Sequence, residues 1–386
     1  MTEKLYYNDS YISDFYANIV AVENIDNSRA LILDKTAFFP EGGGQSADTG
    51  YIGEAFIYDV QEKDGIIYHL TKSTDFPSVN TVAHCVLDAE KRFSKMQSHS
   101  GEHIVSGIAH SCFDAENVGF HMDGTLMTVD FDKPLSKEQL NIIEEKANAC
   151  VYRNEKINTF ILTAEEAAKY SYRSKLDFTG EVRLVEIENT DLCACCAPHL
   201  KSTGEIGIIK ILSSASHRGG VRITLICGKT AFNDYSEKHN STMNISAQLC
   251  SKHDKTAEAV AKLIETNSSL KYEFSARQKI LLEIIASAIK PDNIICEFYN
   301  KLTMDDIREI CNSAKDKCGM ICIILSGNDE NGYAYCIYSE SEKLMSVMEA
   351  FKNTFGASGG GRGNMLQGKV KAGKSQIMNF FTELKV

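Results

Sequence analysis

Residues 229–290 read KTAFNDYSEKHNSTMNISAQLCSKHDKTAEAVAKLIETNSSLKYEFSARQKILLEIIASAIK, and they contain neither glycine nor proline. The whole chain has 26 glycines and 5 prolines, so this gap is long. Because those two residues most often interrupt helices, the stretch predicts a long helix. We expect it to separate an N-terminal part, about residues 1–240, from a C-terminal part, about residues 290–386.

Within the stretch, apolar side chains recur at alternating spacings of three and four residues. The positions are Thr256, Val260, Leu263, Asn267, Leu270, Phe274, Arg277, Leu281, Ile284 and Ala288. Most are apolar, and a polar residue such as Asn267 can set the register of a coiled coil. We therefore expect residues 244–288 to form a homodimer with a second copy, or to pack against their own chain.

The patterns on either side indicate an α+β protein. Short runs that alternate apolar and polar residues, bounded by turn residues, predict a small β-barrel over residues 1–90. Residues 91–240 mix strands with helices near 88–112 and 136–154, without a strict strand–helix rhythm. We expect four parts: the barrel (1–90), a mixed α/β domain (91–240), a long helical linker (241–290) and a C-terminal α/β domain (291–386).

Composition excludes several classes of protein. The longest apolar run, Met320–Leu325, is far shorter than the ~20 residues of a membrane helix. The N-terminus shows no secretory pattern, and 13 cysteines, an odd number, favour reduced thiols in the cytosol. The net charge of −11 argues against a non-specific nucleic-acid coat. Residues 351–386, however, carry six basic side chains against one acidic.

Two pairs of residues have the spacing of metal ligands. His99 and His103 are four apart, so on a helix their imidazoles share one face. Cys195 and His199 are also four apart, but Pro198 places them on a loop. Three imidazoles and a thiolate suit Zn²⁺. Cys193 and Cys196 are rivals for the thiolate, and a cluster of buried reduced cysteines is the ordinary alternative.

Two glycine-rich segments complete the candidate sites. In residues 36–50, three consecutive glycines follow Thr36 and precede Gln45 and Asp48. Because glycines allow the backbone to approach a ligand closely, this segment favours a ligand-contacting surface over a simple long turn. Residues 356–369 also contain a glycine run without the P-loop order. Nearby basic residues predict a docking point for a nucleic-acid backbone: Arg362, Lys369, Lys371 and Lys374.

Taken together, these motifs resemble the editing module of alanyl-tRNA synthetase. The resemblance rests on His99-x-x-x-His103, Cys195-x-x-x-His199 and the segments 36–50, 180–186 and 199–207. The C-terminal Gly359-Gly-Gly-Arg-Gly-Asn is similar to the DHH-associated domain that ends that synthetase. The matches span nearly the whole chain in the family's order. The chain is therefore expected to resemble freestanding, long-form alanyl-tRNA editing proteins.

The resemblance implies hydrolysis in trans of seryl-tRNA(Ala), with glycyl-tRNA(Ala) as a second substrate. It implies one Zn²⁺ per chain, bound by His99, His103, Cys195 and His199, with Thr36 and Gln45 near the amino-acid pocket. Thr36 would be the partner of the serine hydroxyl. One departure is that Ala197-Pro198 stand where the family commonly has Gly-Thr.

Other interpretations remain at this point. Four protein ligands close a tetrahedral shell, so the ion would lose a ligand, expand its shell or orient the substrate's amino group. If it is structural, the protein is a non-enzymatic tRNA-binding module. A DHH-type phosphodiesterase needs an Asp-His-His cluster, and only Lys252-His-Asp254 comes near it. Threonyl-type editing is a neighbouring activity.

For the editing enzyme, we expect the C-terminal domain to hold the body of the tRNA while the zinc-bearing domain takes its acylated end. About 68 Å of helix would separate the two domains.

Overall fold

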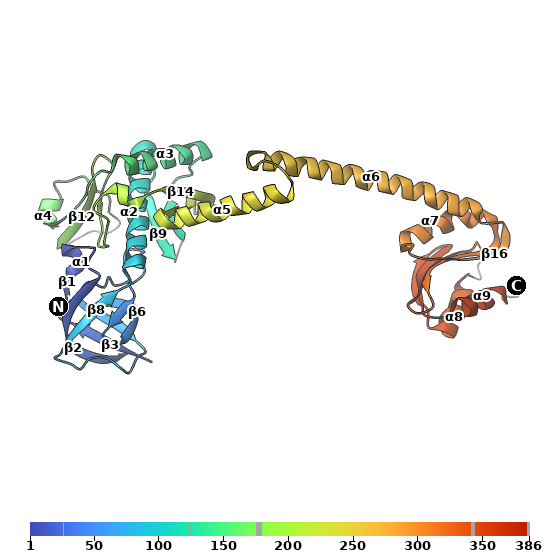
Figure 1. The fold of residues 1–386 in the computed structure, drawn as a ribbon, viewed down its shortest axis with the longest axis horizontal. Helices are drawn as coiled ribbons and strands as arrows, with labels where there is room; N and C mark the ends of the chain where they lie inside the picture. Colours follow the sequence, from blue (N-terminus) through green and yellow to red (C-terminus); the bar gives the residue numbers. More distant parts are fainter. Residues whose placement is uncertain (26, 124–125, 175–179, 341–343, 384–386) are drawn as a thin grey trace. The chain divides into compact units, whose positions relative to one another are not determined.

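The computed structural model describes residues 1–386 except 26, 124–125, 175–179, 341–343 and 384–386. The chain divides into two compact units, Met1–Asn244 and Ile245–Val386 (Figure 1). The predicted mixture of helices and sheets is confirmed. Within the described ranges, no helix is long and apolar enough to cross a membrane.

The first unit opens with a barrel whose strands pair antiparallel in the order β2-β3-β7-β6-β5-β8. In β8 every second residue is buried. This period of two is expected of a strand that has one face in the core and one face exposed to solvent. The strands are β2 (Asp14–Ile25), β3 (Ser28–Leu33), β5 (Gly50–Ile52), β6 (Ala55–Lys63), β7 (Ile66–Thr71) and β8 (Val82–Leu87). A short β1 (Glu3–Lys4) and α1 (Leu5–Asn8) precede them, and β4 (Lys35–Thr36) pairs with β1.

Helix α2 (Ala89–Phe113) joins the barrel to the rest of the first unit. The carboxylate of Asp88 caps its N-terminus by accepting from the amide of Lys91. In the first turn, Arg92 forms an ion pair with Asp48 of the barrel, and both side chains are 2% exposed. Because breaking a buried pair is costly, this contact fixes the start of α2 against the barrel.

Two sheets and helix α3 (Lys137–Arg153) surround the middle of α2, with strand orders β14-β15-β10-β9 and β11-β12-β13. Residues from Met96 to Ala109 are almost all buried, polar ones included. The remaining elements of this part are β9 (Asn117–Asp123), β10 (Leu126–Phe131), β11 (Ile157–Thr163), α4 (Ala164–Ala167), β12 (Glu181–Ile187), β13 (Asp191–Ala194), η1 (Thr203–Ile206), β14 (Ile209–His217) and β15 (Gly220–Cys227).

The single long helix predicted over residues 229–290 is wrong in its middle. Helix α5 (Gly228–Gln248) ends, a 3₁₀ turn η2 (His253–Lys255) follows, and α6 (Thr256–Ala288) begins. Cys250 takes a left-handed φ of 48°, and the hydroxyl of Ser246 donates to the carbonyl of Ser251. A left-handed residue and a side-chain bond of this kind end a helix without glycine or proline, which is why the sequence pattern missed the break.

The second unit carries one mixed sheet in the order β16-β17-β18-β20-β19. Helices α8 and α9 pack on one face, and α7 with the end of α6 packs on the other. The elements are β16 (Asp292–Tyr299), α7 (Met304–Ala314), η3 (Lys315–Lys317), β17 (Cys318–Asn328), β18 (Gly332–Tyr338), α8 (Leu344–Phe355), β19 (Ser358–Arg362), β20 (Met365–Val370) and α9 (Lys374–Thr382).

The second glycine run forms a hairpin here, not the open phosphate-cradling turn that the sequence suggested. Strand β19 is the exposed edge of the sheet and pairs with β20. A Cβ at Gly368 would lie 1.9 Å from the carbonyl oxygen of Ser358, so glycine is needed for the two strands to approach.

Candidate metal centre

Helix α2 carries His99 and His103 on one face, with their ring centroids 5.4 Å apart. Both side chains are buried, at 3% and 2% exposure. The helix approaches β15 closely at Gly101, where a Cβ would lie 2.5 Å from the sulfur of Cys227. The two histidines therefore face the interior of the first unit and not the solvent.

The loop Cys195–His199 follows β13 and is held by polar contacts to its backbone. Arg183 of β12 donates from Nη1 to the carbonyls of Cys195 and Ala197, at 2.8 and 2.9 Å. The hydroxyl of Ser10 donates to the carbonyl of His199 at 2.7 Å. These bonds turn the loop so that its cysteine and histidine meet helix α2.

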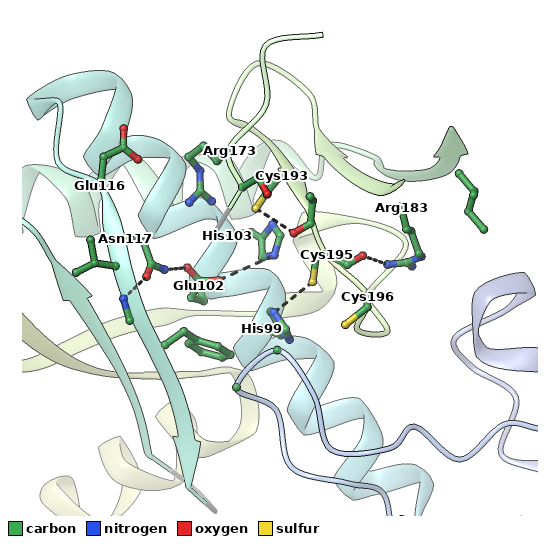
Figure 2. A pocket seen from close by; sticks show the side chains of 18 of the residues that line it. His99, Glu102, His103, Glu116, Asn117, Arg173, Arg183, Cys193, Cys195 and Cys196 are labelled. Atoms are coloured by element: carbon green, nitrogen blue, oxygen red, sulfur yellow. Dashed lines mark hydrogen bonds and ion pairs between the residues drawn. The ribbon is translucent and has the colours of Figure 1, made fainter. Parts of the chain in front are cut away.

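Four side chains converge where the loop meets the helix. One ligand atom each from His99, His103, Cys195 and His199 lie within 4.8 Å of one another. The sulfur of Cys195 is 3.5 Å from Nε2 of His99 and 3.3 Å from Nε2 of His199. Figure 2 shows the sulfur of Cys195 turned toward the imidazole of His99.

Each imidazole is oriented by a partner at its other nitrogen, Nδ1. His99 bonds Oε1 of Gln45 at 2.9 Å, His103 bonds Asp191 at 3.1 Å, and His199 bonds the hydroxyl of Ser100 at 3.0 Å. An Nδ1 proton given to such an oxygen leaves Nε2 free as a ligand, the arrangement typical of metal-binding histidines. The donor set and its outer partners thus fit a borderline-soft divalent cation such as Zn²⁺.

Asp191, the partner of His103, is itself held by an ion pair with Arg173. Arg173 donates to both oxygens of Asp191, at 2.7 and 2.8 Å. Burial alone would raise the pKa of Asp191, but His103 and Arg173 hold it below its usual value. Burial likewise opposes protonation of His103, yet the bond to Asp191 raises its pKa well above the ordinary value. The site therefore favours positive charge at His103, which a cation at Nε2 would supply.

The three cysteines of the loop differ in their thiol chemistry. Burial raises the pKa of Cys193 and of Cys196 to about 11. Burial also acts on Cys195, but His99 and His199 outweigh it and hold the pKa of its thiol well below the usual value. Because the thiolate is the form that binds metal, Cys195 is the favoured ligand of the three.

A cavity of about 670 Å³ opens beside the cluster. Its lining includes His99, His103 and Cys195, with Glu102 and Asn117 beyond them (Figure 2). The amide of Asn117 and the hydroxyl of Ser106 both donate to Oε1 of Glu102, at 2.5 Å each. Sequence reasoning missed these polar residues, although Glu102 lies inside the His99–His103 motif.

The structure separates the two residues proposed to lie near the amino-acid pocket. Gln45 contacts His99, and its Nε2 has no partner within the described residues. Thr36 is fully buried in the barrel and is absent from the lining of the cavity. Its hydroxyl lies 2.8 Å from Nε2 of His69 and accepts from the amide of Phe38 at 3.1 Å. The structure therefore does not bring Thr36 to the metal centre, because its hydroxyl is used inside the barrel.

The basic residues proposed for nucleic-acid docking lie in the second unit. Lys369 and Lys371 line a cavity of about 330 Å³ beside Gly356 and Ser358. Arg362 ends the exposed strand β19, and the ammonium of Lys374 lies 5.1 Å from the ring centroid of Phe298. Arg362 thus lies at the turn end of the β19–β20 hairpin, whereas Lys369 and Lys371 lie at its opposite end.

Comparisons with known proteins agree with this arrangement. Residues 182–224, which hold the loop, match the threonyl and alanyl tRNA synthetase second additional domain. Residues 2–91, which hold the barrel, match the class II (A) tRNA synthetases. The chain is 26% identical over 401 residues to the alanyl-tRNA editing protein AlaX-L of Pyrococcus horikoshii, covering 99% of this chain and 98% of that protein. The resemblance to long-form alanyl-tRNA editing proteins is confirmed.

The chain is also similar to alanine–tRNA ligases. The chain is 29% identical over 385 residues to an alanine–tRNA ligase of Ignicoccus hospitalis, and 29% identical over 400 residues to that of Pyrococcus abyssi. These alignments cover 94% and 96% of this chain but only 40% and 42% of the ligases. The similarity to the ligases is thus confined to about two fifths of their length.

Proposed function

We propose that the protein is a zinc-dependent deacylase of the cytosol that hydrolyses the aminoacyl ester of mischarged tRNA(Ala), with serine or glycine as the amino acid. The observation that carries this proposal is the cluster of His99, His103, Cys195 and His199 beside a cavity of about 670 Å³. A purely structural zinc site needs no such cavity. The similarity along 99% of the chain to an alanyl-tRNA editing protein supports the substrate class.

The chain's own residues supply orientation and hydrogen bonds. A zinc ion, when bound, lowers the pKa of a coordinated water to about 7 and polarises an ester carbonyl. Gln45, which is fully buried, orients His99 through its Oε1. Glu102 and Asn117, which hydrogen-bond each other, give the cavity a polar side where a serine hydroxyl can be placed. A site that hydrogen-bonds the serine hydroxyl would discriminate against alanine, which lacks that hydroxyl.

The test is hydrolysis of Ser-tRNA(Ala), Gly-tRNA(Ala) and Ala-tRNA(Ala) by the purified protein, together with its zinc content. We expect the first two to be hydrolysed and the third to be spared. Cys195→Ala should lose zinc and activity together, because the thiolate is the only anionic ligand of the four. Cys193→Ala and Cys196→Ala are matched controls that should keep both. Full zinc with no hydrolysis of any mischarged tRNA would favour the non-enzymatic alternative.

A further inference from the structure

The cavity beside the metal centre contains a cation that has no acidic partner among the described residues. Arg183 is half-buried on β12 and lines the cavity. Its Nη1 donates to the carbonyls of Cys195 and Ala197. In the described part of the chain, no carboxylate forms an ion pair with Arg183, and its Nε and Nη2 have no acceptor.

Further unused donors lie at the same cavity. The ring centroid of Tyr7 is 5.1 Å from Cζ of Arg183, and the Tyr7 hydroxyl has no partner within the residues that the structure describes. Gly42 and Gln45 exchange two backbone bonds of 3.0 Å, which closes a tight turn at Gly43 and Gly44. The amides of these two glycines, which also line the cavity, have no described acceptor. A Cβ at Gly43 would lie 3.7 Å from the sulfur of Cys196, so the turn is next to the loop that Arg183 holds.

Three acidic residues line the cavity, Glu102, Glu116 and Glu181, and none of them forms an ion pair with Arg183 within the described residues; Glu181, on the same strand, is exposed to solvent. Figure 2 shows Arg183 beside Cys195 and Cys196, with Glu102 and Glu116 beyond His103. Glu116 forms an ion pair with His110 at 2.7 Å, and Glu102 accepts from Ser106 and Asn117. The Arg183 side of the cavity thus offers a guanidinium, a phenol and backbone amides, a set that fits an anion with several oxygens.

We propose that Arg183, Tyr7 and the turn at Gly43 and Gly44 bind the phosphodiester of the terminal nucleotide, the one whose ribose carries the aminoacyl ester. This inference rests on the proposed function, which places that ester at the metal centre. The phosphodiester on the 5′ side of the same nucleoside is then the nearest anion of the substrate. Arginine suits it because the planar fork of Nε and Nη2 can donate two parallel bonds to a phosphate.

The test uses two non-hydrolysable ligands that differ by one charge. Both are 3′-seryl-amino-3′-deoxyadenosine, and one also carries a methyl phosphodiester at its 5′ oxygen. Calorimetric titration of the zinc-loaded protein should show about tenfold tighter binding of the phosphodiester ligand. Arg183→Gln should abolish the tenfold difference in affinity between the two ligands. Arg183→Lys, which keeps the charge, should retain part of this difference. Tyr7→Phe should reduce it about two- to fourfold.

The ratio of the two ligand affinities distinguishes anion binding by Arg183 from its role in holding the loop Cys195–His199. Arg183→Gln also removes the bonds to Cys195 and Ala197, and that loss would weaken both ligands equally. Arg222→Gln is the matched control, because Arg222 pairs with Asp130 and is absent from the cavity lining. Equal affinity of the wild-type protein for both ligands, or an unchanged ratio in Arg183→Gln, would overturn the inference. Hydrolysis of full-length Ser-tRNA(Ala) by the wild-type protein, measured alongside, shows whether the proposed function survives that result.

Discussion

At the scale of single residues, Thr36 shows how a polar side chain can serve the fold where a pocket was expected. Thr36→Val removes the hydroxyl from between Nε2 of His69 and the amide of Phe38, both buried. We expect it to lower the free energy of unfolding by about 1–3 kcal/mol, since two buried polar groups lose their partner. Urea denaturation measures this loss. The ratio of seryl to glycyl ester hydrolysis should stay unchanged, and a selective loss on serine would instead place Thr36 at the substrate.

His69 also makes the barrel sensitive to acid. Its Nδ1 donates to the carbonyl of Leu31 at 2.9 Å, and burial lowers its pKa from 6.5 to about 4. Between these pH values the unfolded chain binds a proton that the folded chain does not, so stability falls as pH drops from about 6.5 to about 4. The full loss is roughly 3 kcal/mol. Thermal melts from pH 7 to pH 4 should show a shallower decline in His69→Gln, and parallel declines would contradict this assignment.

At the scale of elements, helix α6 carries an apolar seam that the described chain leaves exposed. Leu263, Leu270 and Phe274 are 55%, 59% and 67% exposed, and they fall on the three–four spacing that predicts a coiled coil. Only its last turns, at Leu282 and Ala286, are buried. We therefore propose a homodimer along α6, over at most its 33 residues, about 50 Å, since the break at residues 249–255 shortens the predicted helix.

Light scattering tests this dimer. Leu263→Glu combined with Leu270→Glu should convert the protein to a monomer, because the charges would meet across the seam. Lys262→Glu with Lys271→Glu changes neighbouring positions outside the seam and should leave the dimer intact. A wild-type protein that is monomeric at high concentration would remove the homodimer without touching the proposed chemistry.

At the scale of the whole molecule, an acidic chain has to attract a polyanion locally. We propose that Arg362, Lys369 and Lys371 hold the body of the tRNA. Changing all three to glutamine should weaken tRNA binding and reduce its salt dependence by about one phosphate contact per residue. Binding measured at several salt concentrations gives this slope. Hydrolysis of a short acylated mimic of the tRNA end should survive, because the four candidate metal ligands all lie in the first unit.

A second triple variant controls for net charge. Lys271, Lys279 and Lys290 are exposed lysines of the same unit, outside the cavity that Lys369 and Lys371 line. Their change to glutamine removes the same charge and should leave the salt slope nearly unchanged. If both triple variants bound tRNA as the parent does, the hairpin of β19 and β20 would be only a solvated surface.

Local periodicity accounts for what the sequence by itself determined. The spacing of His99 and His103 predicts a shared helix face, because the helical repeat depends only on neighbouring residues. The alternating runs of the first 90 residues predict strands for the same reason. The apolar seam of residues 256–288 likewise follows from the spacing of its side chains along the chain. Local patterns failed at Cys250, where a left-handed residue that is not glycine ends helix α5.

Only the tertiary structure decided which residues meet across long separations. Helix α2 and the loop at Cys195 lie about 90 residues apart, and the supports of the imidazoles come from a third region, at Gln45, and from β13, at Asp191. No local pattern connects Arg173 to Asp191, or Arg183 to the carbonyls of its loop. The burial of Thr36 was equally invisible, since a hydroxyl has the same sequence signature inside a barrel as in a pocket. Such contacts depend on how separate elements pack, because the energy of a buried polar group is set by its partners and not by its neighbours in sequence.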